Sequence, residues 1–183
     1  AMQAGAAAVV ADQSFPEETT TRHIRVKDTT LALGELAAHW RSRFDVPVVG
    51  VTGSNGKTTV SQMIATIFAE EIPGISPRGS FNNHWGVPLT LLTLRDSDAS
   101  AVIEMGMNHA GELSTLGAIV RPTIALITNA AAAHLEGLKS IEGVAKAKGE
   151  LIDQLSQQGI LVLNRDDRFY AQWVARAGAR TVI

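Results

Sequence analysis

The sequence predicts an α/β protein built on a largely parallel, doubly wound sheet. Short apolar runs rich in Val and Ile recur along the chain, most of them end in a polar residue, and segments of helical periodicity separate them. Strands that alternate with helices are typical of parallel sheets, whose ligand crevice lies beyond the carboxyl ends of the strands. We therefore expect the polar residues that follow these strands to mark a functional site.

The amino-terminal part of the chain is expected to precede this sheet. Residues 4–10 are rich in Ala and Val and look like the last helix-to-strand step of a preceding domain, and residues 11–25 form a polar connector. A domain boundary is expected after residue 26, which leaves residues 27–183 as the main domain. That domain is expected to begin with a helix capped by Asp28 or Thr29. The apolar residues of this helix are Leu31, Leu36 and Trp40.

A glycine-punctuated tract, Gly-Val-Thr-Gly-Ser-Asn-Gly-Lys-Thr-Thr, occupies residues 50–59. The apolar run before it, residues 46–49, is expected to form a buried strand, and the helix after it ends before Pro73. The apolar positions of this helix are Val60, Met63, Ile64, Ile67 and Phe68. Glycine-freed N–H groups and the positive end of a helix bind phosphate, so this order predicts a P-loop that binds a nucleoside triphosphate.

Two side chains of the tract suit that chemistry. Lys57 adds a mobile positive charge, and Thr58 supplies a hydroxyl of the kind that Mg²⁺ prefers. The tract departs from the general pattern at Val51, where a glycine is expected. A purely structural glycine turn between strand and helix is the alternative interpretation.

Composition excludes several classes of protein. The chain has 183 residues, of which 45% are hydrophobic and 19% charged, enough for one globular domain and a fragment of another. Its net charge of −2 provides no basic footprint for nucleic acid or an acidic membrane. It has no cysteine, which is compatible with the cytoplasm, and we find no signal peptide or membrane-length apolar run.

Polar residues follow the other expected strands, which are residues 101–103, 124–127 and 160–163. Glu104, Asn129 and Asn164 are therefore expected near the crevice. A carboxylate beside a triphosphate is well placed to hold Mg²⁺, and an ordinary surface glutamate is the alternative for Glu104. His134 is a candidate ligand for a second metal, although a lone histidine is commonly structural.

A helix expected over residues 141–155 carries a lysine on its apolar face. Lys148 lies four residues from both Val144 and Ile152, whereas Lys146 lies four residues from Glu142 and Glu150 and has the pattern of a solvated lysine. Burial disfavours the ammonium form, so Lys148 could take up CO₂ as a carbamate, a carboxylate-like metal ligand. A snorkelling lysine is the alternative.

Five segments together resemble the Mur ligases. They are the tract at 50–59, Phe-Asn-Asn-His-Trp-Gly-Val-Pro-Leu-Thr at 81–90, Glu-Met-Gly-Met-Asn-His-Ala-Gly-Glu at 104–112, Thr128-Asn129 through His134-Leu135-Glu136-Gly137, and Ala-Lys-Gly-Glu at 147–150. The resemblance extends over nearly all of the chain from about residue 28, and the order of the segments makes it specific.

The resemblance implies an ATP-dependent, peptide-bond-forming ligase of cytoplasmic peptidoglycan synthesis. The Asn-Asn, Glu-Met-Gly-Met and Ala-Lys-Gly-Glu segments match the member that phosphorylates the carboxylate of UDP-N-acetylmuramoyl-tripeptide and joins D-Ala-D-Ala to it through an acyl phosphate. It further implies a monomeric full-length enzyme with small-molecule substrates, two Mg²⁺ ions, no nucleic-acid partner and no membrane insertion.

The resemblance also implies roles for individual residues. Lys57, His134 and Lys148 would be catalytic; Thr58 and Glu104 would hold the first Mg²⁺, and His134 and carbamylated Lys148 the second. Asn82 and Asn83 would lie on the substrate side of the cleft, whereas His109 and Asn129 receive no role. The nucleotide would be bound by Thr52, Gly53, Ser54, Asn55, Gly56, Lys57, Thr58 and Thr59.

The same resemblance implies a division into domains. Residues 1–26 would be a remnant of the domain that binds the UDP-linked substrate, and residues 27–183 a central ATP-binding domain truncated at its carboxy-terminal side, with the ligase domain that follows it absent. We expect such a fragment to keep the phosphate and metal site but to ligate little, because positioning both substrates supplies much of the rate.

Three alternatives stay open at this point. Asn164-Arg165-Asp166-Asp167 follows a strand and loosely resembles the guanine-reading motif of GTP switch proteins, although no Asp-x-x-Gly tract accompanies it. Another ligase of the superfamily, either another Mur enzyme or a folylpolyglutamate synthetase, is the second. A folded module that binds nucleotide without turnover is the third.

Overall fold

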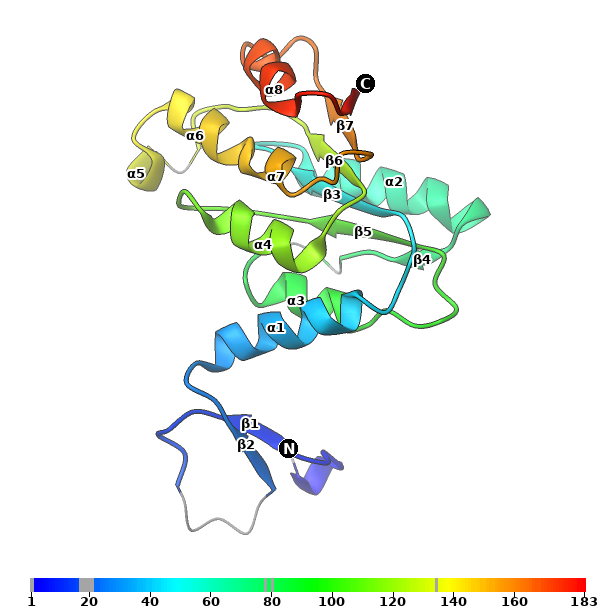
Figure 1. Cartoon of the computed structure of the whole chain (residues 1–183), viewed down its shortest axis with the longest axis vertical. Coiled ribbons are helices and arrows are strands. Elements are labelled where there is room, and N and C mark those ends of the chain that lie inside the picture. Colours follow the sequence, from blue (N-terminus) through cyan, green and yellow to red (C-terminus); the bar gives the residue numbers. More distant parts are fainter. Residues whose placement is uncertain (1, 17–21, 78, 80, 134) are drawn as a thin grey trace.

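The protein contains a six-stranded sheet in which every neighbouring pair of strands is parallel (Figure 1). This computed structural model describes residues 2–16, 22–77, 79, 81–133 and 135–183. The strand order is β4-β5-β3-β6-β7-β8, with bounds Val48–Thr52 (β3), Gly74–Ile75 (β4), Ser100–Glu104 (β5), Ile124–Ile127 (β6), Ile160–Leu163 (β7) and Thr181–Val182 (β8). The chain builds β4 and β5 on one side of β3 and the later strands on the other, so the predicted doubly wound α/β class is confirmed.

The first predicted strand was placed too early. The prediction ended it at residue 49, whereas β3 continues to Thr52, because Gly50 and Val51 pair with both β5 and β6. The glycine loop therefore begins at Gly53. The strands expected at 124–127 and 160–163 are confirmed, and the one expected at 101–103 gains a residue at each end. Edge strands β4 and β8, of two residues each, carried too little pattern to be predicted.

Helices cover the two faces of the sheet unequally. On one face, α2 (Lys57–Glu71) packs Val60, Ile64 and Phe68 against Val49, Val51 and Val102 of the sheet. Met63 and Ile67, which share the helical periodicity, point outward and are 61% and 67% exposed. The opposite face holds the main core, formed with α4 (Glu112–Val120), α6 (Ile141–Lys148), α7 (Glu150–Asp153) and α8 (Tyr170–Ala177) (Figure 1).

The helix predicted over residues 141–155 is divided in two. Helix α6 ends at Lys148, α7 begins at Glu150, and Gly149 lies between them. The N–H of Ile152 donates to Gly149 O at 3.0 Å, a tighter turn than the α-helical one. The short α5 (Leu135–Leu138) precedes α6, whose cap is Ser140. The break leaves Lys148 as the last residue of α6.

Helix α1 (Thr29–Arg41) has the predicted cap, and of its three predicted apolar residues Trp40 packs against the core whereas Leu31 and Leu36 do not. Asp28 Oδ1 accepts from the N–H groups of Thr30 at 2.7 Å and Leu31 at 3.0 Å. Leu31 and Leu36 are 62% and 52% exposed, and the buried side of the helix consists of Gly34, Ala37 and Arg41. Small residues allow α1 to lie close to α4 and to α3 (Gly86–Leu91), so close approach of the backbones outweighs leucine periodicity here.

The amino-terminal part forms a small unit of its own, below α1 in Figure 1. It contains a 3₁₀ turn, η1 (Met2–Ala4), and a parallel pair of strands, β1 (Val9–Ala11) and β2 (His23–Arg25). The predicted polar connector therefore ends in a strand at His23–Arg25. The domain boundary after residue 26 stays a prediction.

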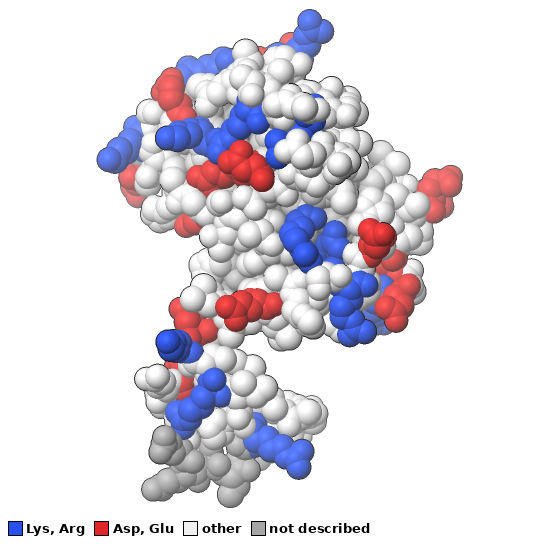
Figure 2. Space-filling view, in the orientation of Figure 1, with Lys and Arg blue, Asp and Glu red and all other residues white. Residues whose placement is uncertain are grey.

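Charged side chains of both signs are interspersed over the face shown in Figure 2. No large area of a single sign appears on that face, in line with the net charge of −2. In the part of the chain that the structure describes, no helix has the length and apolar character needed to cross a membrane.

Candidate functional site

The predicted phosphate loop connects β3 to α2 and has the backbone geometry that such a loop requires. Gly53 and Gly56 have φ angles of 154° and 79°, which favour glycine. A Cβ on Gly53 would lie 1.8 Å from Thr128 Oγ1, so any side chain here would displace the hydroxyl that bonds to the loop. Gly56 caps α2 without a side-chain hydrogen bond. The positive end of a 15-residue helix therefore faces the loop and can receive an anion.

The side chains at the start of α2 lie where the sequence predicted. Lys57 is half-buried and its Nζ donates to Gly53 O at 2.8 Å, folding back over the loop. Thr58 is half-buried in the first turn, and Thr59 is exposed. Thr52 differs from the rest of the predicted set: it is the last residue of β3, pairs with Ile127 and is fully buried, so it lies in the sheet rather than in the loop.

Residues 128–131, which follow β6, are hydrogen-bonded to the phosphate loop. The N–H of Ser54 donates to Asn129 O at 3.0 Å, and the N–H of Asn55 donates to Asn129 Oδ1 at 3.1 Å. Thr128 Oγ1 donates to Asn55 O at 2.7 Å, and the N–H of Ala131 donates to Ser54 Oγ at 2.9 Å. Residues 128–131 thus fix the shape of the loop, a role that sequence reasoning left unassigned for Asn129.

Glu104 is buried, so the alternative of an ordinary surface glutamate is wrong. It ends β5, beside β3, and is 1% exposed. Its Oε1 accepts from Asn82 Nδ2 at 2.7 Å, whereas its buried Oε2 has no hydrogen-bond partner among the described residues. A buried carboxylate oxygen is costly to leave unpaired, so a ligand for it is expected. The hard oxygens of Glu104 and Thr58 fit Mg²⁺.

Lys148 points inward, as its position on the helix predicted. It is 2% exposed, and burial together with the positive charge of Lys57 lowers its pKa from 10.5 to about 7. The influence of Lys57 indicates that the end of α6 lies near the phosphate loop. A substantial fraction of this amine is therefore neutral near pH 7, the form that reacts with CO₂.

The proposed partner of Lys148 in a second metal site cannot be compared with the structure. His134 lies outside the described residues, so its role as a ligand stays a prediction. Among the residues that are described, no three His, Cys, Asp or Glu side chains form a group able to hold a metal ion. A second site of the predicted kind would depend on His134 and on carbamylation of Lys148.

A pocket of about 400 Å³ adjoins the phosphate loop and contains both predicted substrate residues. It is lined by Lys57, Asn82, Asn83, His84, Gly106, Met107, Asn108, Glu112, Thr115 and Leu116. Asn82 holds Glu104 through its amide group and accepts from Gly106 N–H at 2.8 Å through its backbone carbonyl. Asn83 Oδ1 accepts from the N–H groups of Trp85 and Gly86, so this oxygen shapes the start of α3.

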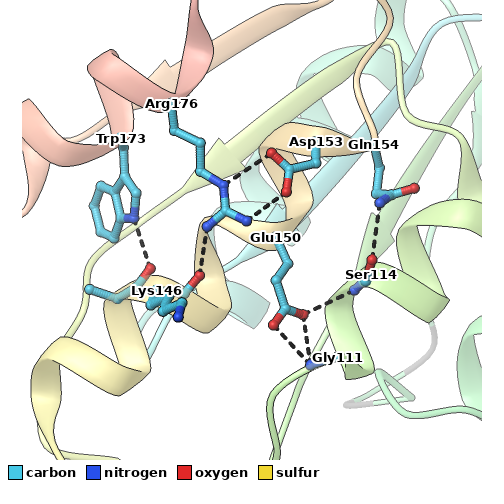
Figure 3. A network of polar contacts seen from close by, with 9 residues as sticks. Gly111, Ser114, Lys146, Glu150, Asp153, Gln154, Trp173 and Arg176 are labelled. Atoms are coloured by element: carbon cyan, nitrogen blue, oxygen red, sulfur yellow. Dashed lines mark hydrogen bonds and ion pairs between the residues drawn. The ribbon is translucent and has the colours of Figure 1, made fainter.

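Polar contacts that the sequence did not predict hold α6, which ends at Lys148, and the adjoining α7 in place (Figure 3). Glu150 accepts from Gly111 N–H at 2.8 and 3.0 Å and from Ser114 N–H at 3.2 Å, which joins α7 to the start of α4. From α8, Trp173 Nε1 donates to Ala145 O at 3.0 Å, and Arg176 pairs with Asp153. These contacts link residues 23 to 39 positions apart, so no local pattern could reveal them.

The charge partners expected for Lys146 are engaged elsewhere. Lys146 is exposed, as predicted, but Glu142 pairs with Arg168 and Glu150 contacts α4. The backbone carbonyl of Lys146 accepts instead from Arg176 Nη1 at 2.9 Å. Charge spacing along one helix was therefore a poor guide, because helices α4 and α8 bring competing partners.

A parallel sheet with a glycine loop leading into a helix defines the class of P-loop α/β nucleotide-binding folds. Residues 51–183 match the family model described as the Mur ligase middle domain, and the chain belongs to the Mur ligase family. It is 44% identical over 169 residues to the UDP-N-acetylmuramoyl-tripeptide–D-alanyl-D-alanine ligase of Escherichia coli K12, covering 92% of this chain but 37% of that enzyme.

Solved structures of the same family superpose closely. A MurF structure from Acinetobacter baumannii has a TM-score of 0.90 and 35% identity, covering 96% of this chain and 38% of that protein. The structure of MurF from Thermotoga maritima in complex with ADP has a TM-score of 0.89 and 28% identity, covering 100% of this chain and 42% of that one. The present chain therefore spans about two fifths of the length of these relatives.

Proposed function

We propose that this chain is the ATP- and Mg²⁺-binding part of a cytoplasmic ligase that adds D-Ala-D-Ala to UDP-N-acetylmuramoyl-tripeptide in peptidoglycan synthesis. The observation that carries the proposal is the hydrogen-bonded glycine loop at the start of α2, with a buried Glu104 oxygen on the neighbouring strand that has no partner among the described residues. The relatives that match most of this chain are named for that reaction. Residues 27–183 would be the central domain.

In the proposed reaction, the protein must bring the anionic carboxylate of the substrate close to the negatively charged γ-phosphate of ATP. In the proposed mechanism, the backbone N–H groups of Gly56 and Lys57 at the start of α2 and the Lys57 ammonium bind phosphate oxygens and offset their negative charge. The N–H groups of Ser54 and Asn55 are bonded to Asn129 and keep the loop in shape. Thr58 and Glu104 would hold Mg²⁺, which supplies further compensation of charge at the phosphates. Asn82 would orient the Glu104 carboxylate through the 2.7 Å hydrogen bond.

Lys148 would contribute in a modified form. Its neutral amine attacks CO₂, the new N–C bond gives a carbamate, and one proton leaves to solvent. The burial that lowers its pKa to about 7 makes the neutral amine available near physiological pH. The carbamate would supply an anionic oxygen for a second Mg²⁺ together with His134.

The alternative of a GTP switch protein is disfavoured by the contacts of its supposed guanine-reading segment. Both carboxylate oxygens of Asp167 accept backbone N–H groups of this chain, from Ala130 and Phe169. The Asn164 Oδ1 accepts from the N–H of Asp166 at 3.1 Å. Both oxygens of Asp167 are therefore engaged within the protein, which disfavours their use in binding guanine.

Calorimetric titration of ATP, and separately GTP, into the 183-residue chain tests the proposal. We expect saturable ATP binding that requires Mg²⁺, is lost in Lys57→Ala and is retained in Lys27→Ala, an exposed lysine outside the site. Preference for GTP would support the switch-protein alternative, and Mg²⁺-independent binding would contradict the roles of Thr58 and Glu104. A parallel assay for joining of the two substrates distinguishes a binding module from a ligase.

A further inference from the structure

The loops that follow three neighbouring strands are joined in series by hydrogen bonds. The phosphate loop after β3 is held by residues 128–131 after β6, and these in turn contact the loop after β7. The connection to β7 is made by Asp167, whose Oδ2 accepts from Ala130 N–H at 2.7 Å. Its Oδ1 accepts from Phe169 N–H at 2.8 Å, so both oxygens are directed at backbone groups.

Ala130 occupies the central position of the segment that holds the phosphate loop. The residue before it, Asn129, exchanges three hydrogen bonds with Ser54 and Asn55, and the residue after it, Ala131, bonds to Ser54 in both directions. A shift of the Ala130 backbone would therefore move both sets of contacts at once. In the described part of the chain, the Asp167 carboxylate is the side-chain partner of the Ala130 N–H.

We propose that Asp167 is a positioning residue for the nucleotide site, acting through Ala130 on the phosphate loop. This inference rests on the proposed nucleotide-binding function. Hydrogen bonds from N–H groups to a carboxylate are among the stronger ones in proteins, and a loop that binds phosphate gains affinity when its N–H groups are already ordered. Without the anchor, ATP would have to order residues 53–56 at the expense of its own binding energy.

The neighbouring aspartate provides a matched control. Asp166 is exposed, whereas Asp167 is half-buried and bonded on both oxygens. Asp166→Asn and Asp167→Asn change the charge of the chain equally and differ by one position. The second replaces one carboxylate oxygen with an amide group that cannot accept a hydrogen bond, and Asp167→Ala removes both acceptors.

Two readouts on the full 183-residue chain test the inference. The first is the Kd of Mg·ATP by calorimetry, for which we expect Asp167→Asn to weaken binding about tenfold, Asp167→Ala at least as much, and Asp166→Asn less than about twofold. The second is the amide NMR spectrum without nucleotide. We expect the resonances of Ala130, Ser54 and Asn55 to move in Asp167→Asn and to stay in place in Asp166→Asn.

The two readouts separate the possible failures. A role in fold stability alone would lower the melting temperature of Asp167→Asn but leave the Ser54 and Asn55 amides and the Kd unchanged, and that result would overturn the inference. If the wild-type chain binds no Mg·ATP, the proposed function fails for this chain. The amide spectrum still decides whether Asp167 positions the loop, and unmoved Ser54 and Asn55 resonances would again refute it.

Discussion

Lys148 should make the stability of this protein depend on pH in a way that one substitution removes. The folded-state pKa is lowered from 10.5 to about 7 by burial and by the charge of Lys57. Between these two values the unfolded chain binds a proton that the folded chain does not, so the free energy of unfolding rises with pH. Below about pH 7 both states bind the proton and this contribution to the slope disappears.

The expected size of the effect is large for a single group. A difference of one bound proton changes the free energy of unfolding by about 1.4 kcal/mol per pH unit. Over the window from about 7 to 10.5, the free energy of unfolding therefore rises by on the order of 5 kcal/mol, which is the cost of burying the protonated Lys148 at low pH. Lys148→Met keeps the length of the buried chain and removes the charge. It should stabilise the protein most at pH 6 and 7 and progressively less up to pH 9.5.

Urea unfolding at pH 6, 7, 8, 9 and 9.5 in CO₂-free buffer measures this difference. Between pH 7 and 9 the difference between Lys148→Met and wild type should narrow by about 2 kcal/mol. Lys146→Met, on the exposed side of the same helix, is the control and should run parallel to wild type. Parallel curves for wild type and Lys148→Met would refute the reasoning, because they would mean that Lys148 stays protonated in the folded protein.

Three further predictions concern the loop, the helix contacts and the metal. Gly53→Ala should weaken Mg·ATP binding at least about tenfold in calorimetry, because the new methyl group would overlap the Thr128 hydroxyl at 1.8 Å. The methyl group of Gly56→Ala meets open space, so this change should only lower the free energy of unfolding, by about 1 kcal/mol, because of the positive φ at this position. Glu150→Gln should lower the free energy of unfolding by about 1–2 kcal/mol in urea titrations, and the exposed control Glu142→Gln should have a smaller effect. Glu104→Gln preserves the shape of the side chain and removes its charge, so the gain in ATP affinity on adding Mg²⁺ should shrink, with Thr58 as the remaining proposed protein ligand; an unchanged gain would exclude Glu104 as a ligand.

Local patterns were sufficient where an element and its function are adjacent in the chain. The glycine tract begins in a strand and ends in a helix, and two of its three glycines, Gly53 and Gly56, have positive φ angles. The inward position of Lys148 followed from helical spacing alone. Even here the boundaries were displaced, because β3 extends to Thr52 through pairing with strands that lie far away in sequence.

Periodicity failed where packing depends on a neighbouring helix. Leu31 and Leu36 are exposed, and Gly34, Ala37 and Arg41 form the buried side of α1, because the close approach of α3 and α4 favours small residues at the first two positions. Lys146 lost its expected partners for a similar reason. Glu142 pairs with Arg168, and Glu150 accepts hydrogen bonds at the start of α4; both partners lie far away in the sequence and are brought close by the tertiary structure.

By itself, the sequence determined the class of fold, the glycine loop between a strand and a helix, and the polar residues that follow three of the strands, since periodicity and glycine placement act over a few residues. Only the tertiary structure decided how those ends are joined. Asp167 reaches Ala130 across 37 positions, Asn129 reaches Asn55 across 74, and Glu150 reaches Gly111 across 39. Such contacts depend on which strands become neighbours and in what register, and that order is set by burial of the whole core rather than by any local segment.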